Sequence, residues 1–123
     1  MPTVEHMDIA ADDIERARTF YTSVFGWKME LAPGMTDYYI IQTAYLDGRQ
    51  GVGGGLGKRG DDTQKITDYF GVTSIDDYVE KIKQAGGRIT LGKTPVEGMG
   101  YLANCIDTEG NPFGIWQEDN SAR

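Results

Sequence analysis

The sequence predicts an α+β fold built from two βαβββ modules within one domain of 123 residues. Two segments carry apolar residues at helical spacing, and each follows a short strand-like segment and ends at glycine. Three more strand-like segments, separated by turn residues, follow each of these helices. A lone βαβββ sheet would leave one face and one edge open. We therefore expect the two modules to form a half-open curved sheet with a concave cup.

The first module starts with a half-apolar strand at residues 4–9. Asp12 is the predicted N-cap of the next helix, and Glu15 follows three residues later as in a capping box. The apolar stripe of this helix consists of Ile14, Ala17, Tyr21, Val24 and Phe25. Gly26 is placed to end the helix in a left-handed turn. Three strands are then expected at residues 28–32, 37–44 and 51–57.

The second module repeats this order. A strand is expected at residues 69–74, and Asp76 and Asp77 open a helix whose stripe is Tyr78, Ile82 and Ala85. Strands at residues 88–91, 100–106 and 112–117 follow the glycine pair that ends this helix. A shift of 61 residues places Gly26 on Gly87 and Gly53 on Gly114. We expect module 1 at about 3–57, a linker at 58–65, module 2 at about 66–118, and a frayed tail at 119–123.

Charge and composition narrow the function classes. The chain has 12 basic and 19 acidic residues, a net charge of -7, one His and one Cys. An acidic chain is not expected to bind nucleic acid or an anionic membrane surface. No apolar run is long enough to span a bilayer, and the first residues lack signal-peptide features. We expect a soluble, cytoplasmic protein in which Cys105 is buried in packing.

Several motifs carry a family resemblance over residues 4–118. They are His6-Met7-Asp8-Ile9, the block from Ala17-Arg18-Thr19-Phe20-Tyr21 to Phe25-Gly26-Trp27, Ala85-Gly86-Gly87, and the turn and strand DTEGNPFGIW at 107–116. In these residues the chain resembles the vicinal oxygen chelate superfamily, which includes glyoxalase I, bleomycin-resistance proteins and extradiol dioxygenases. The resemblance implies a two-module cup and a homodimer.

The resemblance also supplies an expectation about metal. Metal-dependent glyoxalase-like members place four ligands on four strands that line the cup. In this sequence the four positions fall at His6, in the run Gly53-Gly54-Gly55-Leu56, near Tyr69 or Phe70, and at Gly114. His6 is the one side chain that matches a metal ligand. We therefore expect no complete metal site and no cofactor, since one imidazole holds a divalent ion weakly.

The candidate ligand-binding residues are His6, Gln42, Tyr101, Gly114 and Trp116. Strand alternation places His6 and Asp8 on one face, so that the carboxylate could orient the imidazole for acid–base work. Gly114 would leave room for a ligand beside Trp116. The alternatives are ordinary ones: a partly buried histidine with satisfied hydrogen bonds, and aromatic residues that serve only packing. Only one of Tyr38 and Tyr39 can face the cup, and the sequence leaves open which.

Three functions fit these observations. The leading hypothesis is a protein of the bleomycin-resistance kind that binds a small organic molecule in the cup without a complete catalytic metal site. An acidic chain favours a neutral or cationic ligand. The second is a glyoxalase-like lyase or isomerase, with a rebuilt metal site or with His6 and Asp8 in acid–base roles. The third is a non-catalytic module that binds protein partners.

Overall fold

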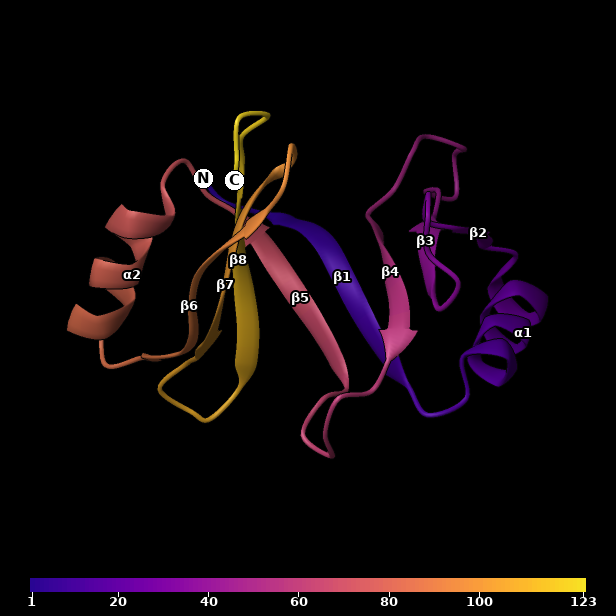
Figure 1. Cartoon of the computed structure of the whole chain (residues 1–123), viewed down its shortest axis with the longest axis horizontal. Helices are drawn as coiled ribbons and strands as arrows, with labels where there is room; N and C mark the ends of the chain where they lie inside the picture. The colour runs from indigo at the N-terminus through magenta and orange to yellow at the C-terminus, as the bar shows by residue number, and fades with distance from the viewer. The chain divides into compact units, whose positions relative to one another are not determined.

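The computed structural model describes all 123 residues, which divide into two compact units. The N-terminal unit is Glu5–Thr67, and the C-terminal unit combines Met1–Val4 with Asp68–Arg123. In chain order the elements are β1 (Val4–Ala11), α1 (Ile14–Phe25), β2 (Lys28–Leu31), β3 (Tyr38–Gln42), β4 (Gly53–Lys58), β5 (Ile66–Gly71), α2 (Ile75–Gln84), β6 (Arg88–Val96), β7 (Gly100–Ile106) and β8 (Pro112–Glu118). The α+β class and the two βαβββ modules are confirmed (Figure 1).

In the N-terminal unit the strands lie in the order β2-β3-β4-β1. β1 and β4 are parallel, and β4, β3 and β2 are joined by antiparallel pairing. The buried core consists of Ile9, Ala11, Met29, Tyr39, Ile41 and Leu56, against which Ile14, Ala17 and Tyr21 of α1 pack. Because side chains alternate along a strand, this core leaves the opposite face of the sheet uncovered by α1.

The C-terminal unit repeats the arrangement with the strand order β5-β8-β7-β6. β5 and β8 are parallel, whereas β8, β7 and β6 pair antiparallel. Its core is formed by Ile75, Ala103, Cys105 and Ile115, with Tyr78, Val79 and Ile82 of α2 packed against it. Cys105 is 1% exposed, which confirms its expected packing role. Burial raises the pKa of this thiol to about 11.

Each helix begins directly after a residue whose side chain accepts a hydrogen bond from a backbone amide of the first turn. Asp13, rather than Asp12, is the N-cap of α1, and its carboxylate accepts from the Arg16 amide at 2.9 Å. α2 begins earlier than expected because the Ser74 hydroxyl accepts from the Asp77 amide at 3.2 Å. At the other end of α1, Gly26 has a φ of 71°, as expected of a left-handed C-cap.

Some strand bounds differ from the expected ones. β5 runs over Ile66–Gly71 instead of 69–74, since Ser74 serves as the cap of α2. β6 continues to Val96, past Gly92 and Pro95, as an edge strand with two register shifts. Bulges and an edge position allow such residues within a strand.

The expected frayed tail is wrong. Ala122 is 1% exposed, and its carbonyl accepts from the Gly98 amide at 3.0 Å. The Asp119 amide donates to the Met99 carbonyl at 2.9 Å. The last residues are therefore fixed to the β6–β7 turn. No helix in the structure is long and apolar enough to span a membrane.

Candidate functional site

A polar cluster lies on the uncovered face of the N-terminal sheet. His6 Nε2 and Asp8 Oδ1 are 2.7 Å apart, and the Tyr38 hydroxyl donates to the same Asp8 oxygen at 3.2 Å. A carboxylate only accepts, so in this geometry the Nε2 proton of His6 is donated to Asp8. The His6 and Asp8 side chains are 38% and 39% exposed, and they are therefore open to a solute.

The glycines of β4 explain how Tyr38 reaches this cluster. A Cβ atom at Gly55 would lie 1.7 Å from the Tyr38 hydroxyl oxygen, and one at Gly57 would lie 3.1 Å from the ring. Glycine at these positions thus lets the Tyr38 ring lie directly across β4 towards Asp8 of the next strand.

Tyr39 points to the other face, which answers the question that the sequence left open. Its ring is buried in the core, its hydroxyl donates to Glu15 Oε1 at 2.6 Å, and the Arg18 guanidinium lies 4.8 Å from its centre. This hydrogen bond lowers the pKa of Glu15 and raises that of Tyr39. Tyr39 therefore has a structural role, and Tyr38 is the tyrosine on the uncovered face.

On the C-terminal sheet the space above Gly114 is filled. A Cβ atom there would lie 2.2 Å from Cδ1 and Cε1 of Tyr69, and the Tyr69 hydroxyl donates to Asn104 Oδ1 at 2.9 Å. The expectation that Gly114 leaves room for a ligand is wrong, because the protein's own ring occupies that space. The contact between Tyr69 and Asn104 was not predicted from the sequence. In the sheet register each of these two residues lies opposite Gly114.

Trp116 and Tyr101 lie on opposite faces of the C-terminal sheet. Trp116 shares the uncovered face with Gly114, is half-buried, and covers Gly100, where a Cβ atom would lie 2.7 Å from its ring. Tyr101 packs against the core beneath α2, and the Lys93 ammonium lies 4.6 Å from its ring centre. Tyr101 therefore lies on the core face of this sheet, away from Trp116.

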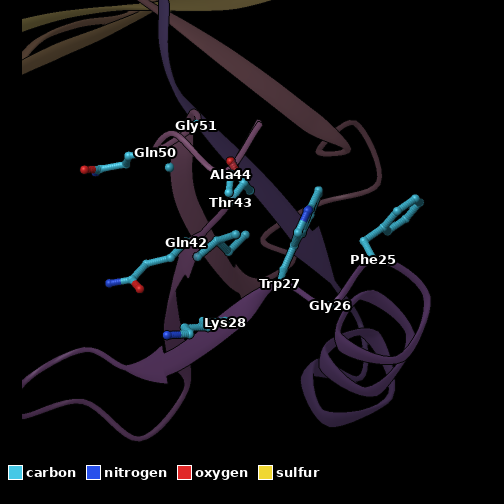
Figure 2. Close-up of a pocket in the computed structure, with 12 residues that line it drawn as sticks. Phe25, Gly26, Trp27, Lys28, Gln42, Thr43, Ala44, Gln50 and Gly51 are labelled. Atoms are coloured by element: carbon cyan, nitrogen blue, oxygen red, sulfur yellow. The ribbon is translucent and has the colours of Figure 1, made fainter. Parts of the chain in front are cut away.

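A pocket of about 440 Å³ lies at one end of the N-terminal sheet. It is lined by Phe25, Gly26, Trp27, Lys28, Ile41, Gln42, Thr43, Ala44, Gly48, Gln50, Gly51 and Gly53. Figure 2 shows the side chains of Lys28, Gln42 and Gln50 extending to one side, with Phe25 on the other side of Trp27. Of the expected ligand-binding residues, Gln42 is the one that lines this pocket.

Comparison with models of known protein families identifies the superfamily of the chain. Residues 3–115 match the model of the Glyoxalase/Bleomycin resistance protein/Dioxygenase superfamily. The chain belongs to this superfamily. The expected vicinal oxygen chelate membership is thereby confirmed.

The chain is also similar to curated proteins from two mycobacteria. A protein named "Putative glyoxylase CFP32" in Mycobacterium tuberculosis and in Mycobacterium bovis is 25% identical over 118 residues, which are 94% of this chain. The chain spans 45% of the length of these relatives.

Two solved structures show the fold. A superfamily member from Vibrio splendidus has a TM-score of 0.69 at 14% identity and covers 96% of this chain and 100% of its own. A methylmalonyl-CoA epimerase in complex with methylmalonyl-CoA has a TM-score of 0.66 at 16% identity and covers 99% and 98%.

The residues present do not fit the metal site that the superfamily resemblance implies. In the N-terminal unit His6 pairs with Gly53, and in the C-terminal unit Tyr69 pairs with Gly114. Two of these four positions have no side chain, and a third is a phenol whose hydroxyl is bonded to Asn104. No three His, Cys, Asp or Glu side chains are grouped so that they could hold a metal ion.

Proposed function

We propose that the protein binds a small organic molecule through side chains on the uncovered faces of its sheets, without a complete catalytic metal site. The observation that carries this proposal is the His6–Asp8–Tyr38 cluster. It presents an imidazole and a phenol whose orientation is set by one carboxylate, on a face that the helix leaves open. Groups held in this way recognise a ligand with little loss of side-chain entropy.

Trp116 supplies an apolar surface on the uncovered face of the C-terminal unit. Its indole is half-buried over Gly100, so the ring is held in place while part of it stays accessible. Such a ring suits a flat or cationic ligand. The net charge of -7 likewise favours neutral and cationic ligands at these faces.

A thermal-shift screen of aromatic and cationic compounds tests this proposal. A ligand that binds the folded state raises the melting temperature. We expect at least one compound to raise it, and we expect His6→Ala to weaken that shift while Glu5→Ala, an exposed neighbour on β1, leaves it unchanged. A shift that both variants retain would contradict the role of His6. A panel with no shift would favour a module that acts through protein partners.

Acid–base catalysis is a second candidate, and the 2.7 Å contact between His6 and Asp8 favours it. With the Nε2 proton donated to Asp8, the basic lone pair of the imidazole is on Nδ1, as a general base requires. The reaction class would be that of a lyase or an isomerase. Deuterium exchange from water into a carbon-bound position of the bound ligand, followed by NMR, would identify this chemistry. Exchange should disappear in His6→Gln, and its survival there would exclude His6 as the base.

We further propose that the protein is a cytoplasmic homodimer. Dimerisation is supported by the superfamily resemblance. A cytoplasmic location is supported by the single cysteine, which is buried and unpaired. Sedimentation equilibrium across a hundredfold range of protein concentration would give twice the chain mass of 13.6 kDa if the proposal holds.

A further inference from the structure

The pocket at the end of the N-terminal sheet has other lining residues than the polar cluster, although Gly53, which lines the pocket, pairs with His6. None of His6, Asp8 and Tyr38 lines it. Its volume of about 440 Å³ is within the range of small-molecule sites, which is roughly 300–1,000 Å³. What it could bind follows from its walls.

One wall is aromatic and held in place. The left-handed turn at Gly26 brings Phe25 and Trp27 together, with ring centres 5.4 Å apart and planes 27° apart. Trp27 also stacks on Tyr21, at 5.1 Å and 1°. Trp27 is half-buried, so part of its indole stays accessible. This fixed indole is a surface on which a planar ring can stack.

A second part of the lining comes from the loop that joins β3 and β4. The Thr43 hydroxyl donates to the Val52 carbonyl at 2.5 Å, and the Gly51 amide donates to the Thr43 carbonyl at 2.9 Å. A Cβ atom at Gly51 would lie 2.6 Å from the Thr43 hydroxyl oxygen, so glycine is needed for this closure. The pocket is therefore formed before any ligand binds, which lowers the entropy cost of binding.

The pocket contains one positive charge and no negative charge. Lys28 is the sole charged residue among those that line it, and its ammonium makes no ion pair within the chain. The exposed amides of Gln42 and Gln50 extend to the same side as this ammonium (Figure 2). An unpaired cation with two amide donors matches a carboxylate, in contrast to the acidic character of the whole chain.

We propose that this pocket is a second ligand site, which binds a planar aromatic carboxylate. The ring stacks against Trp27, and the carboxylate accepts hydrogen bonds from Lys28 and from the amide of Gln42 or Gln50. The proposal does not depend on the function assigned to the His6–Asp8–Tyr38 cluster, since the two sets share no residue.

The two tryptophans allow a direct test. In ¹H–¹⁵N spectra each indole N–H gives its own resonance, which Trp27→Phe and Trp116→Phe assign. The probe is 2-naphthoate, and 2-naphthalenemethanol and 2-naphthylmethylammonium are the neutral and cationic analogues. We expect 2-naphthoate to shift the Trp27 resonance and to bind at least tenfold more tightly than either analogue. A Trp27 resonance that does not move at millimolar 2-naphthoate, or an ammonium analogue that binds as well, would overturn the proposal.

Variants separate the charge from the ring contact. Lys28→Met keeps the apolar stem and should weaken 2-naphthoate binding at least tenfold while changing the alcohol less than twofold. Lys65→Met is the matched control, because Lys65 is an exposed lysine of the same unit outside the pocket, and it should change neither. His6→Ala should also leave 2-naphthoate binding unchanged. Equal affinity in Lys28→Met and the wild type would refute the proposed role of the ammonium.

Discussion

Replacing Gly114 by alanine tests whether the Tyr69 ring fills the space above this residue of β8 or leaves it open to a ligand. The added Cβ would lie 2.2 Å from two ring carbons of Tyr69, more than 1 Å inside ordinary contact. The ring is 6% exposed and is held by its hydrogen bond to Asn104, so it cannot move freely. Overpacking of this kind costs about 1–3 kcal/mol, and loss of the hydrogen bond adds about 1 kcal/mol. We expect Gly114→Ala to lower the free energy of unfolding by about 2–4 kcal/mol.

This energy corresponds to a large shift in melting temperature. An unfolding entropy of about 2.1 cal/mol/K per residue amounts to about 0.26 kcal/mol/K for the whole chain, so the melting temperature should fall by roughly 8–15 °C. Urea unfolding and calorimetry measure both quantities. Gly92→Ala is the matched control, because its Cβ would meet nothing within 4 Å, and it should change stability little.

A double-mutant cycle assigns the cost to the ring. If Tyr69 causes it, Gly114→Ala should cost much less in a Tyr69→Ala background than in the wild type. A Gly114→Ala variant as stable as Gly92→Ala, with an impaired response to ligand, would refute the reasoning. Such a result would indicate that the space above Gly114 is accessible to a ligand.

Three further predictions concern single side chains. The hydrogen bond from Tyr39 is the main cause that lowers the pKa of Glu15 from 4.5. The ionised carboxylate therefore stabilises the folded state above pH 4.5, and this contribution is lost as the pH falls through the lowered pKa. Between pH 6 and pH 2.5 the melting temperature should fall less steeply in Tyr39→Phe than in the wild type. Cys105, with a pKa raised to about 11, should react with Ellman's reagent at pH 8 only after unfolding in urea, and rapid labelling of the folded protein would contradict its burial. Ser74→Ala should lower the free energy of unfolding by about 1 kcal/mol through loss of the α2 N-cap, whereas Ser121→Ala, in the chain's last turn, should have a smaller effect in the same urea titration.

Much of the fold could be predicted because its signals are local. Gly26 ends α1 as expected, since a left-handed turn favours glycine and the apolar stripe stops there. The choice between Asp12 and Asp13 was missed because both are good caps, and the Asp12 carboxylate instead accepts from Arg59, which is far away in sequence. The tail was missed because its contacts, such as the one between Gly98 and Ala122, join residues that are far apart in sequence.

The candidate site was predicted less completely. His6 and Asp8 were found because alternation along one strand is a local rule, and their 2.7 Å contact agrees with it. The role of Gly114 was misjudged because the ring that fills its space comes from a different strand, β5. The pocket beside Trp27 was missed except for Gln42, although the adjacent Phe25, Gly26 and Trp27 were a usable signal of two aromatic rings at a sharp turn.

The proposal that side chains, and not a metal ion, recognise the ligand has one most direct test. It is the affinity of a compound from the thermal-shift screen, measured by calorimetry on the same preparation in EDTA and after addition of Ni²⁺, Zn²⁺ or Mn²⁺. We predict the same dissociation constant in all these conditions, with a loss of binding in His6→Ala. Binding that vanishes in EDTA and returns with one equivalent of a divalent ion would contradict the account.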